Sequence, residues 1–264
     1  MTKDLRALGL QAGDTAMLHV SIKAIGWIVG GPDIVIKSIL DVISDSGTIM
    51  MMASWEESTY HMDRWSAERK QAYLEECPPF DPATSRARTR EMGVLPEYLR
   101  TWPGAHRSGH PDASFAAIGA RADWLTRDHP MNYPNGTGSP LGKLYQTSGK
   151  VLSLGAPLET LTVLHHSENL ARIPDKRVVR HQAPVLRDGE PVWITIEDFD
   201  SSTGIVPWDG EDYFRVIGRE AIAAGLARQG QVGSATSYLF DAKDLVDFGV
   251  EWLERIFGAN PPQQ

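Results

Sequence analysis

The sequence predicts an α/β fold in which helices flank a mixed central β-sheet. Residues 15–20 and 48–52 are short apolar segments typical of buried strands, and a helical pattern lies between them. A strand–helix–strand order of this kind forms a parallel pair with a right-handed connection. An Asp-Gly pair at 188–189 divides residues 183–196 into two strand-like halves, which predicts an antiparallel hairpin element. Parallel units combined with a hairpin indicate a mixed sheet.

The remaining elements follow from the same patterns. The helix between the first two strands begins at Pro32-Asp33 and ends before Gly47. Residues 56–78 are polar and charged, which favours a helical insertion on the surface. Further buried strands are expected at residues 114–119, 151–155 and 232–240. Asp241 is expected to cap a final helix, whose apolar face consists of Leu245, Val246, Val250, Leu253 and Phe257.

Length and charge limit the possible functions. The chain has 264 residues, which suits one domain with a sizeable core, and no linker clearly divides it, so we expect a single domain over residues 1–264. The net charge of −8 and the lack of a Lys/Arg block argue against nucleic acid as a partner. An acidic surface weakly favours cationic small molecules, although many proteins carry such a charge for solubility alone.

Targeting and redox signals are few. The N-terminus lacks a secretory pattern. Gly30, Gly31 and Lys37 interrupt the longest apolar region, residues 25–43, so no membrane span is expected and we predict a cytoplasmic protein. Cys77 is the only cysteine in the sequence, which excludes a disulfide within the chain and a cysteine-based zinc site.

His165 and Glu168 form the most suggestive pair for chemistry. If residues 160–173 are helical, the two side chains lie one turn apart and can touch. A carboxylate beside an imidazole fixes its tautomer and stabilises its protonated form, as a general base requires. The same spacing also occurs in ordinary pairs on solvated helix faces, so spacing alone leaves both explanations open. His166 shares a stripe with Val163 and Leu170 and is expected to be a packed histidine.

Two loops have features of anion-binding sites. The loop from Ser21 to Gly31 joins a strand to a helix and contains Lys23 and several glycines, so its backbone N–H groups suit the phosphates of a nucleotide-type cofactor. It is neither a P-loop nor a dinucleotide-binding motif, so neither ATP nor NAD is indicated. A second loop places Arg107 and His110 before a strand, where they can meet a phosphate. Ordinary turns also explain both loops, and glycine-rich turns most often have no other role.

An acidic turn follows the predicted hairpin. Glu197, Asp198 and Asp200 bring three carboxylates close together, and like charges at this density favour a neutralising cation. A metal ion, a polycationic ligand and a solvated turn all fit this pattern.

Seven motifs, taken in order along the chain, resemble the aminoglycoside 3-N-acetyltransferase family. They are His19-x-Ser21-Ile22-Lys23-x-Ile25-Gly26, Phe80-Asp-Pro-Ala-Thr84, Met92-Gly-Val-Leu-Pro-Glu97, Arg107-Ser-Gly-His-Pro111 leading into Ser114-Phe-Ala-Ala117, Gly138-Ser-Pro-Leu141, Thr162-Val-Leu-His-His-Ser-Glu168 and Glu197-Asp-Phe-Asp200. The resemblance covers about residues 15 to 257. It departs from the family pattern at Ser167, where the family usually has Ala, and near Glu159, where Asp is common.

The resemblance implies a role for each motif. His165 would act as general base on the substrate amine, with Glu168 orienting it. Acetyl-CoA would be the cosubstrate, and no metal would be needed. The residues that would lie along acetyl-CoA are Ser21, Ile22, Lys23, Gly26, Gly30, Gly31, Arg107, Ser108, His110 and Ser139. The residues that would bind a cationic aminoglycoside are Glu197, Asp198 and Asp200.

The resemblance therefore predicts an acetyltransferase that acetylates the 3-amino group of 2-deoxystreptamine aminoglycosides and confers resistance. Transfer would be direct, in a ternary complex, because the only thiol lies in the polar stretch around Cys77. Two alternative functions belong to other classes of protein. One is a metal-dependent hydrolase that uses His165, Glu168 and the acidic turn, and the other is a non-catalytic protein that binds CoA or the antibiotic. Neither nucleic acid nor membrane is an expected partner, and the protein would be a monomer or a homodimer.

Overall fold

The computed structural model describes residues 1–259, in which strands and helices alternate along the chain. The strands are β1 (Thr15–Val20), β2 (Thr48–Met52), β3 (His106–Arg107), β4 (Phe115–Gly119), β5 (Lys150–Leu154), β6 (Val178–Arg187), β7 (Glu190–Phe199), β8 (Ala227–Val232) and β9 (Ala235–Asp241). The helices are α1 (Thr2–Leu8), α2 (Ile22–Ile25), α3 (Gly31–Ile43), α4 (Ala67–Glu76), α5 (Thr89–Met92), α6 (Leu95–Arg100), α7 (Ala122–Thr126), α8 (Pro140–Gln146), α9 (Leu164–Leu170), α10 (Tyr213–Ala223) and α11 (Ala242–Phe257), with 3-10 turns η1 (Met62–Arg64) and η2 (Leu158–Thr160). The last five residues of the predicted single domain lie outside the described residues.

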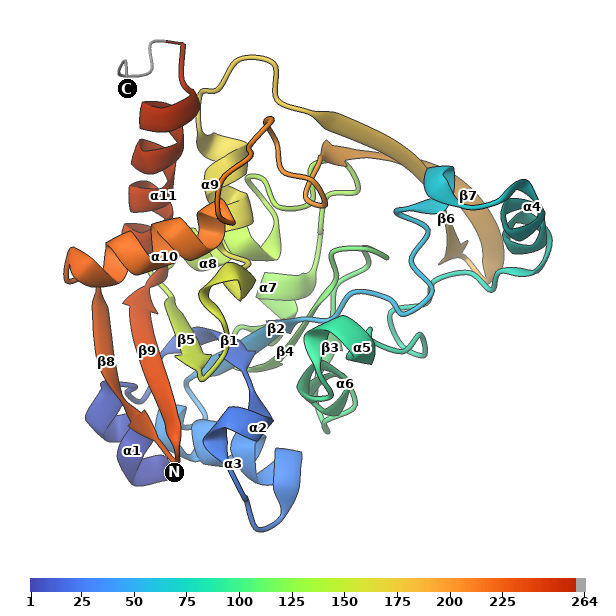
Figure 1. Cartoon of the computed structure of the whole chain (residues 1–264). Helices are drawn as coiled ribbons and strands as arrows, with labels where there is room; N and C mark the ends of the chain where they lie inside the picture. Colours follow the sequence, from blue (N-terminus) through green and yellow to red (C-terminus); the bar gives the residue numbers. More distant parts are fainter. Residues whose placement is uncertain (260–264) are drawn as a thin grey trace.

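The central sheet is mixed, as predicted, and its strands lie in the order β3-β4-β2-β1-β5-β9-β8. Strand β1 pairs in parallel with both β2 and β5, so the predicted parallel unit is confirmed. The antiparallel members are β4 beside β2 and β9 beside β5. The sheet is therefore mixed because of these flanking strands, whereas the predicted hairpin lies outside it (Figure 1).

The hairpin β6–β7 is confirmed and forms a two-stranded sheet of its own. Asp188 and Gly189 make its turn with φ values of 51° and 84°, the left-handed conformation that an Asp-Gly turn allows. It is longer than predicted and extends to one side of the central sheet (Figure 1). A small cluster of Trp55, Phe80 and Val185 packs the hairpin against the rest of the protein.

Helices cover both faces of the central sheet. Along β1, Ala16 and Leu18 point into one core while Met17 points into the other, as the alternation of a strand requires. The first core includes side chains of α1, α3 and α6, and the second includes side chains of α8, α9, α10 and α11. Figure 1 shows the corresponding layers. Across residues 1–259, no helix has both the length and the apolar character needed to cross a membrane.

Of three further local predictions, two differ from the structure and one agrees with it. The loop expected at residues 21–31 contains the short helix α2, because the Ser21 hydroxyl accepts a hydrogen bond from the Ala24 N–H at 3.3 Å and starts a turn. The strand expected at 232–240 is the second half of a hairpin, β8–β9, whose first strand is too polar to be recognised by its pattern. The surface helix expected within 56–78 is present as α4, with exposed or half-buried side chains.

Asp241 lies at the N-cap position of α11, but its carboxylate accepts a hydrogen bond from Lys150 Nζ at 2.7 Å. The predicted cap is therefore replaced by an ion pair between neighbouring strands β9 and β5. The helix begins where expected because its apolar face packs into the second core.

Gly119, the last residue of β4, offers a test of the close approach between β4 and the start of β2. Its φ is 120°, and a Cβ there would lie 2.1 Å from the carbonyl oxygen of Gly47. We expect Gly119→Ala to lower the free energy of unfolding by about 2 kcal/mol or more, because the backbone of β2 must move. The matched control is Gly104→Ala, which also has positive φ but meets nothing within 4 Å. Chemical denaturation measures both, and equal losses would contradict the expected clash.

Candidate active site

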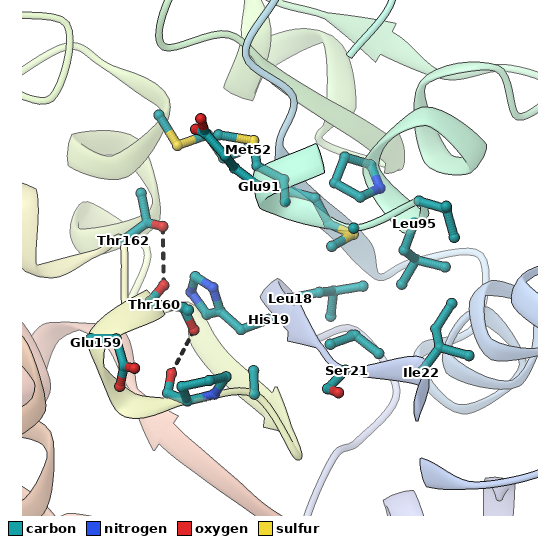
Figure 2. Close-up of a pocket in the computed structure, with 18 of the residues that line it drawn as sticks. Leu18, His19, Ser21, Ile22, Met52, Glu91, Leu95, Glu159, Thr160 and Thr162 are labelled. Atoms are coloured by element: carbon teal, nitrogen blue, oxygen red, sulfur yellow. Dashed lines mark hydrogen bonds between the residues drawn. The ribbon is translucent and has the colours of Figure 1, made fainter. Parts of the chain in front are cut away.

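A cavity of about 450 Å³ lies beyond the carboxyl end of β1. Parallel strands gather ligand sites at this end. The lining comes from the end of β1 with α2, the end of β2, the α5–α6 segment, and the segment from Ala156 to His165. Figure 2 shows Leu18, His19 and Ser21 on one side of this space, facing Thr160 and Glu159, with Glu91 and Met52 above them. We call it the larger cavity.

A second cavity of about 330 Å³ adjoins the larger one, and we call it the acidic cavity. Its lining includes the carboxylates of Glu91, Asp112 and Asp198 together with residues of the hairpin and of the 54–61 segment. Some residues line both cavities and so mark the junction between them. These are Met52, Glu91, Met92, Thr162 and His165.

His165 and Glu168 are in contact at this junction. The Nδ1 atom of His165 lies 2.6 Å from Oε2 of Glu168, as the i,i+3 spacing predicts, although α9 is shorter than the helix expected over 160–173. Tyr213, at the start of α10, donates its hydroxyl hydrogen to the other oxygen of Glu168. The carboxylate is only 3% exposed, so both of its oxygens are paired away from water. The result is a chain of contacts from Tyr213 through Glu168 to His165.

These contacts shift the pKa values of His165 and Tyr213. Burial by itself would lower the pKa of His165, but the charge and hydrogen bond of Glu168, with smaller effects of Asp198 and Asp212, raise it above its ordinary value. Burial and the neighbouring Glu168 charge raise the pKa of Tyr213, so its hydroxyl stays a donor. Because Nδ1 of His165 is bound to the carboxylate, Nε2 is the nitrogen available for proton transfer.

His166 differs from its neighbour, as predicted. It is buried, and its Nδ1 donates a hydrogen bond to the carbonyl oxygen of Asn135 at 2.8 Å. Burial lowers its pKa, so the ring stays neutral and serves packing.

Of the three carboxylates in the predicted acidic turn, Asp198 lines the acidic cavity. It is 5% exposed, accepts a hydrogen bond from the Phe199 N–H at 2.8 Å, and burial raises its pKa to about 7. Glu197 instead accepts hydrogen bonds from Tyr133 and Arg180.

Asp200 accepts hydrogen bonds from the backbone and side chains of Ser202 and Thr203, which closes a local turn. The structure therefore disperses the predicted cluster. In the part of the chain that the structure describes, no group of three His, Cys, Asp or Glu side chains is arranged to hold a metal ion.

The six residues of the 21–31 loop that were predicted to lie along a cofactor divide into two sets. Ser21, Ile22 and Lys23 line the larger cavity. Gly26, Gly30 and Gly31 lie outside the lining of both cavities within the described chain, and their positive φ values shape the connection into α3. These glycines thus determine the backbone conformation of the loop.

Arg107, Ser108 and Ser139 have partners inside the protein. The guanidinium of Arg107 donates to the carbonyl oxygens of Ser85 and Ala53 and, at 3.1 Å, to the hydroxyl of Ser114. Ser108 accepts a hydrogen bond from the Phe115 N–H, and Ser139 caps α8. The structure does not bring these three side chains to either cavity.

His110 lines the acidic cavity but not the larger one, as far as the described residues define them. Its Nδ1 accepts hydrogen bonds from the backbone N–H groups of Asp112 and Ala113, and its Nε2 donates to the carbonyl oxygen of Met131 at 3.1 Å. These contacts and its burial, which lowers its pKa to about 4, give it a neutral, fixed ring.

Comparison with known proteins decides the family. The family model described as aminoglycoside 3-N-acetyltransferase matches residues 17–254, nearly the whole chain. The chain belongs to the aminoglycoside 3-N-acetyltransferase family. The resemblance found in the sequence is therefore confirmed, and the protein is an enzyme of this class.

Relatives and solved structures agree with this assignment. Aminoglycoside N(3)-acetyltransferase III of Pseudomonas aeruginosa is 48% identical over 254 residues, which cover 96% of this chain and 92% of the relative. The structure of AAC-IIIb in a binary complex with CoASH matches with a TM-score of 0.92 and 46% identity, covering 99% of this chain and 97% of that one. The neutron/X-ray structure of sisomicin-bound AAC-VIa matches with a TM-score of 0.90 and 39% identity, covering 97% of each chain.

Sequence reasoning missed several residues of this acetyltransferase-family cleft. Tyr213 lies 45 positions from Glu168, so no local spacing could reveal their contact. Asp112 directly follows the Arg107–Pro111 motif, whose signal in the sequence comes from its basic residues. It nevertheless lines the acidic cavity, and its Oδ2 lies 2.7 Å from Nε2 of His181. Burial would raise the pKa of Asp112, but the contacts with His181 lower it, so this carboxylate is charged.

The raised pKa of Asp198 predicts a pH-dependent effect on stability. Its folded pKa of about 7 exceeds its unfolded value, so this carboxylate destabilises the fold increasingly as pH rises through that range. We expect Asp198→Asn to raise the free energy of unfolding at pH 8 by on the order of 1 to 3 kcal/mol, and by less at pH 5.

The matched control is Asp200→Asn. Burial would raise the pKa of Asp200, but hydrogen bonds from Thr203 and Ser202 lower it, so its charge stabilises the fold above its unfolded pKa. This variant should therefore be less stable than the parent at pH 8. Urea denaturation at the two pH values measures both variants, and a destabilised Asp198→Asn protein at pH 8 would contradict the expected sign.

Proposed function

We propose that the protein transfers the acetyl group of acetyl-CoA to the 3-amino group of a 2-deoxystreptamine aminoglycoside, in a ternary complex, and so confers resistance. The observation that carries the proposal is the position of His165 in the lining shared by two cavities of different character. A base at such a junction can accept a proton from an amine in one cavity while the thioester lies in the other.

The larger cavity suits acetyl-CoA. Its lining is mainly apolar, from Leu18, Ile22 and neighbouring methionines, and it also includes the exposed Lys23. An apolar channel fits a pantetheine arm, and Lys23 can pair with a phosphate. A solved relative of the same fold is in complex with CoASH, which supports this assignment.

The acidic cavity suits a polycationic antibiotic. Glu91, Asp112 and Asp198 line it, and each can accept hydrogen bonds from an ammonium group. Burial of Asp198 strengthens its attraction for a cation, because a bound ammonium would compensate the desolvated charge. A relative of the same fold is bound to sisomicin, which supports an aminoglycoside in this cavity.

In the proposed reaction, the substrate reacts as the neutral amine, its ammonium form having first lost a proton to solvent. Nε2 of His165 removes a proton from this amine as its nitrogen attacks the thioester carbonyl carbon. The C–N bond forms, the C–S bond then breaks, and CoA leaves as a thiolate that takes up the proton held by the His165 imidazolium. Glu168 stabilises the imidazolium that forms, and Tyr213 holds Glu168 in position. Cys77 lies outside both linings, beside the small hairpin cluster, and burial raises its pKa to about 11, which favours direct transfer over an acyl-enzyme.

We further propose that the enzyme is cytoplasmic and is a monomer or a homodimer. Residues of a single chain line both cavities and supply the whole contact chain from Tyr213 to His165, so either assembly is compatible with it.

Release of free CoA thiol tests the reaction. We expect the purified protein to release thiol from acetyl-CoA only when an aminoglycoside is added, and His165→Ala to lower kcat by about 100- to 10,000-fold. The control is His106→Ala, which removes an exposed histidine outside both linings of the described chain. Binding of both ligands without turnover would favour a non-catalytic binder, and turnover abolished by a chelator would favour the metal-dependent hydrolase.

The pH dependence of kcat/KM tests the role of Glu168. His165 must be neutral to accept a proton, so the rate should fall as pH drops through its raised pKa. Glu168→Gln removes the charge that raises this pKa, and the acid limb should move to lower pH by about one unit while the plateau falls. Glu220→Gln, at an exposed ion pair with Arg255, should leave the profile unchanged. An acid limb that stays in place would separate Glu168 from the titrating base.

A further inference from the structure

His19 is the last-but-one residue of β1, and its side chain lines the larger cavity. Figure 2 shows its ring projecting into the space beside Thr160, which neighbours the junction residue Thr162. Thr162 donates its hydroxyl hydrogen to the carbonyl oxygen of Thr160 at 3.1 Å, which ties these positions together. His165 lines this cavity too, so a thioester bound here as proposed would share one cavity with both histidines.

The imidazole of His19 is incompletely satisfied. It is 8% exposed, and its Nε2 has no hydrogen-bond partner among the described residues. A buried polar atom without a partner is costly in a folded protein, and a ligand that completes its hydrogen bonding is one explanation of its persistence. His19 begins the first of the seven sequence motifs, yet it takes no part in the proton transfer from the amine to His165.

The threonine hydroxyls near this point already donate to backbone carbonyl oxygens, and the Ser21 hydroxyl is held at the start of α2. The hydroxyl of Thr160 donates to the carbonyl oxygen of Pro157 at 2.6 Å, and that of Thr162 is bound to Thr160. The oxygen of Ser21 accepts the Ala24 N–H as a helix cap. The reaction needs a donor for the carbonyl oxygen, because that oxygen gains negative charge when the amine attacks.

We propose that a ring N–H of His19 donates a hydrogen bond to the thioester carbonyl oxygen and stabilises the oxyanion of the tetrahedral intermediate. The inference rests on the proposed function and adds a second catalytic residue to it. His19 keeps its proton throughout. The amine proton goes to His165, the new C–N bond forms, and the electrons of the broken C–S bond leave with CoA. His19 strengthens one hydrogen bond as the charge develops.

The surroundings of His19 suit this role. Burial lowers the pKa of His19 to about 4, so its ring is neutral at neutral pH. A neutral imidazole has one N–H and donates without introducing a charge that would compete with His165 for protonation.

His19→Leu, His19→Phe and His19→Gln form the test. We expect the leucine and phenylalanine variants to lower kcat by roughly 100- to 1,000-fold, as loss of one oxyanion donor does. Their affinity for CoA, measured by calorimetry, should change less than about threefold, because CoA lacks the acetyl oxygen. His19→Gln keeps an N–H donor and should recover at least tenfold of the lost rate.

Thermal unfolding separates this role from a structural one. Replacing a buried polar group that lacks a partner by an apolar side chain should leave Tm unchanged or raise it. A lower Tm with CoA affinity and kcat reduced together would show a structural histidine and overturn the proposal. So would a kcat within threefold of the parent in both apolar variants, or no recovery by glutamine.

Failure of the proposed function can be distinguished from failure of the role proposed for His19. If the parent protein releases no thiol with any aminoglycoside, both proposals are overturned. If the parent turns over and the apolar variants do too, only the role of His19 is overturned.

Discussion

The buried carboxylate of Glu168 is the interaction on which the site depends. A charge that is almost fully removed from water is tolerated only when its oxygens are paired. His165 occupies one oxygen and Tyr213 the other, so a single carboxylate joins α9 to α10. Because the imidazole is held through Nδ1, its Nε2 is left for chemistry at the junction of the two cavities. Packing of α9 against α11 in the second core keeps this arrangement in place.

The two cavities differ because different parts of the fold line them. The larger cavity lies where strands of the central sheet end, so apolar side chains from the sheet and its helices form most of its wall. The hairpin β6–β7 reaches across from outside the sheet and brings Asp198 and His181 to the acidic cavity. Asp112 meets His181 there, which anchors the hairpin to the body of the protein. In the proposed reaction, the donor and acceptor substrates would thus each meet a surface suited to their own chemistry.

Contacts between residues that are close in the sequence were predictable from their spacing. The parallel unit, the Asp-Gly hairpin and the histidine–glutamate contact all follow from periodicity over a few residues. The contacts of polar residues whose partners lie far away in the sequence were less predictable. Arg107 and Ser139 belong to motifs with the chemistry of ligand binding, but the folded chain uses them to hold its own backbone. Asp241 has the sequence position of a helix cap, but the neighbouring strand offers Lys150 as a stronger partner.

The sequence by itself determined the class of fold, the order of most elements, the family and the contact between His165 and Glu168. Helical geometry decides that contact, because side chains three positions apart lie on the same face. Only the tertiary structure decided which carboxylate of the acidic turn faces a cavity, that Tyr213 completes the pairing of Glu168, and that the ring of His19 has a nitrogen without a partner. These properties depend on burial and on residues far apart along the chain, and local spacing carries no information about either.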